Sequence, residues 1–469
     1  MAYWPSGSLR DSSNSDFDIF LRSGPKFQDF LTHPLTLDEL PSCKNYLSQN
    51  VQKQDISCLI SYITIMPLET DTNERKYKLP YLSSKILSED YPDILDIINE
   101  DQELLDSLLK YLKQSNPLNQ LLTSYFTNLC TSLLSRDKQL LKMIFSTDLS
   151  FILTHFANRS LLELYQCLIK KSLKSKNMKA KGQILLSQVI ENLQSPELCK
   201  NAQNVLGEII FEDEVYNEIT EKIPEIFRNL NGKNEDVLTC SLKVIKSILE
   251  KEKDLKKIDE DEWGKEEIIE NLCLNIGTFK RILVSNFENT LPTSMGGFIN
   301  PAGEKKLVIF EILSISVETN KNSLYKKLEE EDLLNVLIEV FEMHPWNSFL
   351  HNIFVQFCIV VMQSSLASSF SDKVLRIIKK YCLNTEFAYN KCLGLVAYCW
   401  KIGENLVEKA KNDEDIAKVL GNDDKWEEIK GRINWKAQFE EKYGNQAISG
   451  QGNGPVNTNV QEVVMTGMC

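Results

Sequence analysis

Histidine is scarce in this 469-residue chain, which contains only four: His33, His155, His344 and His351. The twelve cysteines form no CxxC pair, so neither a zinc site with closely spaced ligands nor a disulfide framework is indicated. Most of them lie in apolar helical stretches, where a free thiol behaves as a small hydrophobe. We therefore expect reduced thiols, no metal site and no cofactor.

An excess of positive charge is also missing. The chain carries 53 Lys and Arg against 66 Asp and Glu, for a formal net charge of −13. Nucleic acids and anionic lipids attract clustered basic residues, so we expect neither as a main partner. The longest apolar run, residues 353–362, contains Gln356 and is too short to span a bilayer. Because residues 1–5 also lack the features of a signal peptide, we expect a soluble protein of the cytoplasm or nucleus.

Recognisable catalytic motifs are absent as well. The sequence contains no HExxH, no GxSxG and no metal-phosphatase motif, and its nearest approach to a Walker A loop has Glu304 in place of the phosphate-binding lysine. A general base at His344 or His351 would need a nucleophile and an orienting acid, which the spacing does not suggest. We interpret both as capping and packing residues. An unrecognised enzyme remains an alternative, and it would require a deep pocket with a buried polar cluster of shifted pKa.

What the sequence does contain is helical periodicity. From about residue 90 onward apolar residues recur on one helix face, as in residues 104–112. Asn116 and Pro117 have the residue types of an N-cap and a first helical position. Residues 307–315 favour a strand by composition but do not alternate, and we interpret them as a buried helix. Because such units recur at roughly 40 residues, we predict an all-α fold, an irregular armadillo/HEAT-like α-solenoid.

Composition suggests three parts along the chain. We expect residues 1–30 to form a poorly ordered arm and residues 31–440 to form one helical domain. Residues 441–469 contain many Gly, Asn and Gln with little apolar content, which predicts a disordered tail. The charged run at 253–264 is expected to be a solvated loop or helix end.

Several segments resemble one family. Residues 116–126 (NPLNQLLTSYF) are similar to the signature P-P-L-N-P-L-L-A-S-F-F of the SAPS-domain family, the Sit-four-associated proteins. Residues 346–351 (WNSFLH) match its W-N-N-F-L-H motif, and residues 78–87 and 424–426 resemble two further segments in the same order. Gln120 and Lys85 replace a proline and a glutamate of the family pattern. The ordered matches span about residues 35–440.

The resemblance implies a function that the residues alone do not. In that family the helical domain is a non-catalytic regulatory or scaffold subunit that binds a catalytic subunit of the Sit-four/protein phosphatase six class of Ser/Thr phosphatases. It directs that enzyme's substrate choice or location, and an ankyrin-repeat subunit as a further partner is left open. The alternative is an armadillo-like trafficking or nuclear-transport adaptor. Such adaptors carry ladders of Trp and Asn at repeat spacing, whereas the six Trp of this chain are scattered.

The matched motifs also supply candidate site residues. Within the motifs, Asn119, Ser124 and His351 are the predicted exposed protein-binding residues, and for His351 this prediction is the alternative to the packing role given above. The other motif positions are expected to hold the fold together. Pro80 and Tyr81 would set a turn, and Trp346 and Asn347 would anchor and cap a helix. The remaining structural positions are Leu118, Leu121, Leu122, Phe126, Phe349 and Trp426.

Overall fold

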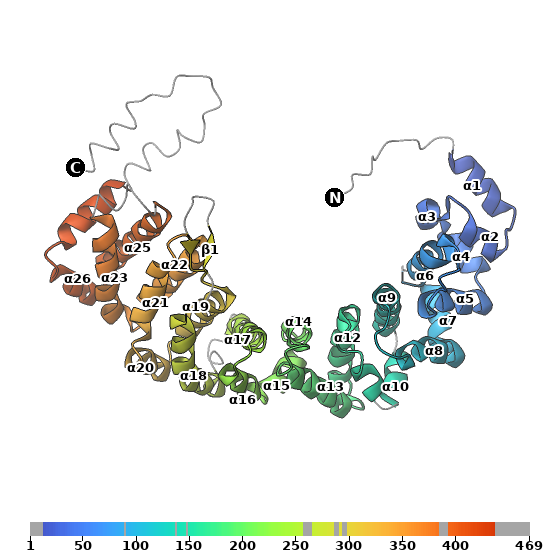
Figure 1. Cartoon of the computed structure of the whole chain (residues 1–469), viewed down its shortest axis with the longest axis horizontal. Helices are drawn as coiled ribbons and strands as arrows, with labels where there is room; N and C mark the ends of the chain where they lie inside the picture. The colour runs from blue at the N-terminus through green and yellow to red at the C-terminus, as the bar shows by residue number, and fades with distance from the viewer. Residues whose placement is uncertain are drawn as a thin grey trace, which may run out of the picture. The chain divides into compact units, whose positions relative to one another are not determined.

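The computed structural model describes residues 13–88, 91–136, 138–146, 149–256, 265–285, 290–292, 298–383 and 393–436. Over these residues the chain is almost entirely helical, as predicted (Figure 1). The helices cluster into two compact units, Met1–Glu218 and Ile219–Cys469, with the boundary inside α15 (Asp213–Thr220). Residues 31–440, which the sequence analysis assigns to one helical domain, fall in both units, and that assignment stays a prediction.

Unit 1 is built from short and medium-length helices. Its elements are α1 (Ser13–Arg22), α2 (Phe27–Thr32), α3 (Thr36–Glu39), the 3₁₀ helix η1 (Leu40–Cys43), α4 (Lys44–Asn50), α5 (Lys53–Thr64), the π-helix η2 (Glu74–Lys78), α6 (Leu79–Ser88), α7 (Pro92–Glu100), α8 (Gln102–Leu109), η3 (Lys110–Lys113), α9 (Gln120–Arg136), α10 (Gln139–Ser146), α11 (Ser150–Leu153), η4 (Arg159–Leu161), α12 (Leu162–Leu173), α13 (Lys179–Asn192) and α14 (Cys199–Ile209). In one layer α6 packs on α9, α9 on α12 and α12 on α14, while α13 covers α12 and α14 from the other side.

Unit 2 repeats this arrangement with longer helices. Its elements are α16 (Ile223–Arg228), η5 (Asn229–Asn231), α17 (Glu235–Lys256), α18 (Glu266–Val284), the two-residue strands β1 (Leu291–Pro292) and β2 (Phe298–Ile299), α19 (Glu304–Val317), α20 (Asn322–Glu330), α21 (Leu333–Met343), α22 (Ser348–Met362), α23 (Ala367–Cys382), α25 (Leu393–Asn412), α26 (Glu414–Gly421) and a last helix over residues 426–436. Residues 307–315 lie in α19, which confirms the helix predicted there.

The helices of unit 2 form two layers. One layer runs α17, α19, α22, α25, and the other runs α18, α20 with α21, α23, α26, each helix packing on the next. Lys246 pairs with Glu311 at 2.8 Å and Lys253 with Glu318 at 2.7 Å, so a later residue of α17 meets a later residue of α19. The two helices are therefore parallel. In an α-solenoid, antiparallel helix pairs stack so that the corresponding helices of successive pairs are parallel. This is the predicted fold class.

Side-chain caps begin several of these helices where the sequence places a short polar residue. The Asp101 carboxylate accepts hydrogen bonds from the amides of Glu103 and Leu104, at 2.9 and 3.1 Å, and starts α8. Asp413 begins α26 in the same way, accepting from the Ile416 amide at 3.2 Å. Each cap satisfies amides that have no partner within the helix.

The N-terminal region differs from the expected arm. Residues 13–30 contain α1 and α2, and Phe17, Phe27 and Phe30 are buried. The rings of Phe17 and Phe20 contact His33, whose centroid lies 4.4 Å from that of Phe20. The aromatic residues therefore pack part of the segment that was expected to be a poorly ordered arm. The predicted tail, residues 441–469, lies outside the described residues, as does the charged run from residue 257 to 264.

Candidate protein-binding surfaces

A pocket opens in unit 2 where α19 and α22 begin. It is lined by residues 298–303, which lead from β2 into α19, and by residues 343–349, which lead from α21 into α22, and its volume is about 520 Å³. We call it the α22 pocket. Pro345 interrupts the helical pattern between α21 and α22, and Gly303 precedes α19 at a positive φ of 74° that most residues avoid. At Pro345 and Gly303 the chain is therefore not helical, and these two non-helical segments border the α22 pocket.

The rim of the α22 pocket is aromatic and faces solvent. Phe298, Trp346 and Phe349 expose 74%, 63% and 74% of their surfaces. Trp346 and Phe349 were expected to be structural, and that expectation is wrong because neither side chain enters the helix layers. The expected cap is confirmed: the Asn347 side-chain oxygen accepts from the Leu350 amide at 3.0 Å.

Under the rim lies a buried group of cationic and imidazole side chains. Lys306, in the first turn of α19, has its Nζ 3.4 Å from His344 Nε2, and His344 Nδ1 lies 3.0 Å from the carbonyl oxygen of Asn300. Burial lowers the pKa of Lys306, and burial together with the nearby Lys306 lowers the pKa of His344. Both effects arise because a low-polarity surrounding disfavours the charged form.

His351 is one turn inside α22 and is buried, which corrects its prediction as an exposed residue. Its ring contacts Phe341 and Tyr398, at centroid distances of 4.7 and 5.2 Å. Burial lowers its pKa to about 4, and its Nε2 has no hydrogen-bond partner among the described residues. His351 lies on the side of α22 that faces α25. The motif by itself does not show which side of α22 another helix covers.

These groups do not form a catalytic constellation within the described part of the chain. No described carboxylate or hydroxyl hydrogen-bonds to the side chains of Lys306, His344 or His351. A triad needs a nucleophile and an acid that orients its base. The buried polar groups with shifted pKa values that an enzyme would need are therefore present, but the described residues provide no nucleophile or orienting acid beside them.

The other motif region, in unit 1, begins α9. Asn119 is exposed, and its side-chain oxygen accepts from the amides of Leu121 and Leu122, both at 3.0 Å, so Asn119 is the N-cap. The predicted cap at Asn116 is wrong. The Asn116 amide instead donates to the Thr154 carbonyl at 2.7 Å, and its oxygen contacts His155. The Asn116 side chain is thus engaged in tertiary contacts with the loop after α11 and does not cap α9.

Leu118, Leu122 and Phe126 are buried, as their spacing predicted. Leu121 is exposed, which corrects its assignment to the core: a helix turns by about 100° per residue, so neighbouring positions face different ways. Pro80 is the second residue of α6, which directly follows the π-helix η2, so it lies within helical backbone rather than at a turn between elements.

Leu121 belongs to a small apolar surface in unit 1. Tyr81 of α6 is exposed and meets Tyr125 of α9 edge to face, with ring centroids 6.4 Å apart. Ser124 lies beside Tyr125 and is half-buried. We call Tyr81, Leu121, Ser124 and Tyr125 the Tyr81 patch. The sequence analysis predicted Ser124 as a binding residue and assigned Tyr81 and Leu121 structural roles, and the binding role of Ser124 stays a prediction. Asn119 and Ser124 lie in unit 1, whereas His351 lies in unit 2.

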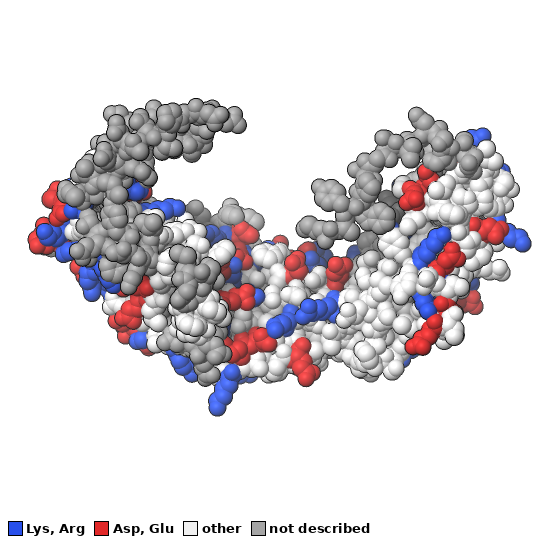
Figure 2. Space-filling model, turned by 45° about the horizontal axis from the view of Figure 1, so that its top comes forward, with Lys and Arg blue, Asp and Glu red and all other residues white. Residues whose placement is uncertain are grey.

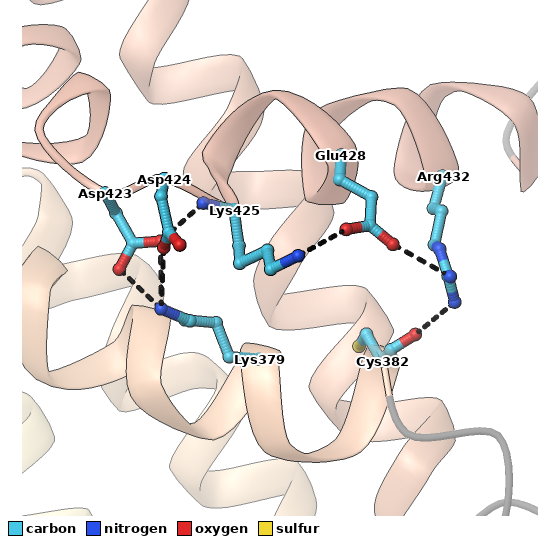
Figure 3. Close-up of polar contacts among 7 residues, drawn as sticks. All are labelled: Lys379, Cys382, Asp423, Asp424, Lys425, Glu428 and Arg432. Carbon is cyan, nitrogen blue, oxygen red and sulfur yellow. Dashed lines mark hydrogen bonds and ion pairs between the residues drawn. The ribbon is translucent and has the colours of Figure 1, made fainter.

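Trp426 is buried at the start of the last helix, as a structural residue would be. Figure 3 shows polar contacts around this helix. Arg432 of the helix donates to the Cys382 carbonyl of α23 at 3.4 Å, and Lys379 of α23 pairs with Asp423, just before the helix, at 2.7 Å. Arg432 also pairs with Glu428 one turn earlier in its own helix, at 2.9 Å. The segment resembling the family's tryptophan motif thus packs beside α23 in unit 2.

Outside these two surfaces, charges of both signs are mixed. On the face seen in Figure 2, Lys and Arg are interspersed with Asp and Glu without a broad patch of one sign. The described residues contain no group of three or more His, Cys, Asp and Glu side chains placed to hold a metal ion. Cys130, Cys358 and Cys399 are buried and their pKa values are raised by burial, as for apolar filler. No described helix is long and apolar enough to cross a bilayer.

Regulatory subunits of one Ser/Thr phosphatase align with this chain. Serine/threonine-protein phosphatase 6 regulatory subunit 3-A of Xenopus laevis is 24% identical over 351 residues, 66% of this chain and 41% of that protein. Subunit 3-B of the same species is 24% identical over 399 residues, 76% of this chain and 47% of that protein. Regulatory subunit 2 of Mus musculus is 23% identical over 376 residues, 70% of this chain and 40% of that protein.

The chain is related to the phosphatase 6 regulatory subunits. This relationship confirms the resemblance drawn from the motifs. The chain spans less than half the length of these curated relatives.

Two further comparisons add less. No protein-family model matches the chain. Among solved structures, importin beta aligns with a TM-score of 0.46 and 10% identity, covering 87% of this chain and 53% of that one. The α-solenoid fold of this chain is instead assigned from the helix packing within each unit.

Proposed function

We propose that this chain is a non-catalytic regulatory subunit that binds the catalytic subunit of a phosphatase 6-type Ser/Thr phosphatase and directs its substrate choice or location. The observation that carries the proposal is the alignment with named phosphatase 6 regulatory subunits over 66–76% of the chain. A cytoplasmic or nuclear site of action belongs to the same proposal, as does an ankyrin-repeat protein as a third subunit.

The Tyr81 patch is the part of unit 1 that we assign to the catalytic subunit. It combines exposed Tyr81 and Leu121 with Ser124, and Lys85 reaches over the Tyr81 ring at 5.9 Å. Aromatic side chains contribute large contact areas at protein interfaces. A stable interface buries about 1,200–2,000 Å² in total, so the patch would be the centre of a wider contact.

The direct test is purification of the tagged chain from its own cells. We expect a toxin-sensitive Ser/Thr phosphatase activity in the purified material, and mass spectrometry should identify a phosphatase 6-type catalytic subunit. A known phosphatase regulatory subunit, purified in parallel, is the positive control. If the control captures phosphatase and this chain does not, the proposal is wrong, and partners typical of transport adaptors would favour the alternative function.

The assignment of the patch needs matched variants. Leu121→Asp combined with Ser124→Arg places one charge at the exposed position and one at the half-buried position of the patch, and should abolish co-purification of the phosphatase. Leu274→Asp, at a residue of α18 that exposes 80% of its surface, is the control and should leave co-purification unchanged. Retention of the phosphatase by the double variant, with normal folding, would move its binding surface elsewhere.

A further inference from the structure

Lys306 is a buried ammonium group whose charge the described residues do not balance. Its side chain is almost fully buried, and its one hydrogen-bond partner among the described residues is the imidazole of His344, which is not an anion. Burying a charge without an opposite charge is unfavourable, and proteins usually avoid it. A carboxylate entering the adjacent α22 pocket would approach this cation through His344, which lines the pocket.

Two helix N-termini add to the positive character of the pocket. Gly303 precedes α19 and Asn347 precedes α22, and both residues line the cavity. The positive ends of two helix dipoles therefore lie at the pocket, against one negative end, that of α21 at Met343, and this balance favours an anion. The Oδ1 atom of Asn300, another lining residue, is buried without a hydrogen-bond partner among the described residues, so it can accept a bond from an incoming N–H group.

The acidic residues nearest to these helix starts are already engaged by other lysines. Glu304 pairs with Lys243 at 2.7 Å, and Glu342 pairs with Lys380 at 2.9 Å. Lys305, next to Lys306, forms an ion pair with Glu235. Lys306 is thus the cation near the pocket for which the described residues provide no acid. Above it stand the exposed rings of Phe298, Trp346 and Phe349.

We propose that the α22 pocket binds a peptide segment of a partner protein that carries a bulky apolar side chain next to a carboxylate. The aromatic rim takes the apolar side chain, and the carboxylate lies between the two helix starts, over His344 and Lys306. A volume of about 520 Å³ accommodates one large side chain and its neighbour. The inference goes beyond the proposed function, because it holds whether the segment belongs to a phosphatase, a substrate or another subunit.

The test uses the purified 469-residue chain without any phosphatase, so its outcome is independent of the proposed function. A phage-displayed library of random twelve-residue peptides is selected against the immobilised protein. We expect enriched peptides to place Phe, Trp, Leu or Met within about two residues of Asp or Glu. Replacing those acids by Asn or Gln in a synthetic enriched peptide should weaken binding about tenfold or more. Selection of no common pattern, or of basic peptides, would overturn the proposal.

Variants locate the binding. Trp346→Ala with Phe349→Ala removes two exposed rings and should reduce binding of the enriched peptide about tenfold or more, whereas Leu274→Ala, exposed but outside the pocket, should not. Lys306→Met should remove the preference for the acidic peptide over its amide counterpart while the protein stays folded. Binding that survives the double substitution unchanged would place the peptide elsewhere and contradict the assignment.

A segment of the chain itself is the competing occupant. Residues 384–392, which lie outside the described residues, contain Glu386 and Phe387 and thus carry the same chemistry. A variant with these nine residues replaced by Gly and Ser is selected in parallel. Peptide binding seen only in this variant would assign the pocket to the chain's own segment, and equal binding in both proteins supports a partner.

Discussion

His351 illustrates at the residue scale how burial changes a titratable group. Its pKa of about 4 in the folded protein compares with about 6.5 in an unfolded chain. As the pH falls below 6.5 the unfolded chain binds the proton first, so protonation favours unfolding until the pH drops below the folded pKa. The lost stability amounts to roughly 3 kcal/mol at the low-pH limit.

His351→Leu should remove this pH dependence. The variant and the parent should have similar urea midpoints at pH 7.5, where the imidazole is neutral in both states. At pH 4.5 the variant should be more stable than the parent by roughly 2–3 kcal/mol. Parallel pH profiles for the two proteins would show that His351 is not a buried neutral histidine.

The two motif tryptophans should behave oppositely on truncation. Trp426 is buried, so Trp426→Ala should cost about 3–5 kcal/mol of unfolding free energy through lost burial and a cavity. Trp346 is exposed, and Trp346→Ala should change stability by less than about 0.5 kcal/mol. Thermal melts of both variants test this, and a large destabilisation by Trp346→Ala would mean that the ring supports the fold.

For single residues, the sequence predicted some local roles correctly but often not whether the side chain is buried or exposed. It predicted the cap at Asn347 and the buried Leu122, both of which the structure confirms. It placed Leu121 and Phe349 inside and His351 outside, and all three are reversed. A motif records which residues recur together, whereas exposure depends on which neighbouring helix covers each face.

At the scale of elements, close helix approach depends on Gly182. A Cβ atom added there would lie 3.0 Å from the Cβ of Ser172 and 3.2 Å from Leu173, so α13 and α12 would have to separate. Gly182→Ala should therefore cost about 1–3 kcal/mol through overpacking. Thermal or urea unfolding measures the effect.

Gly277 in α18 is the matched control. A Cβ added there meets nothing within 4 Å, so Gly277→Ala should stabilise the chain by roughly 0.5–1 kcal/mol through improved helix propensity. Equal effects of the two substitutions would show that the α12–α13 contact is looser than described. Helix position was predictable from periodicity, but this close contact was not, because it pairs residues of two different helices.

At the scale of the whole molecule, each unit has its own core. The layers α6, α9, α12, α14 and α17, α19, α22, α25 each bury their apolar faces within one unit. Fragments 1–221 and 212–469, which both retain α15, should therefore each give a helical circular dichroism spectrum and a cooperative thermal transition. A gradual, non-cooperative melt of either fragment would show that its fold needs the other unit.

The sequence by itself determined the helical class, the positions of most helices and the relationship to the phosphatase regulatory subunits, because periodicity and motifs are local properties of the chain. Only the tertiary structure decided which motif residues face solvent and which residues meet. Lys306 and His344 are 38 residues apart and come together because α19 and α21 lie in adjacent repeats. The packing of one repeat on the next chooses the buried face of each helix, and no single repeat contains that information.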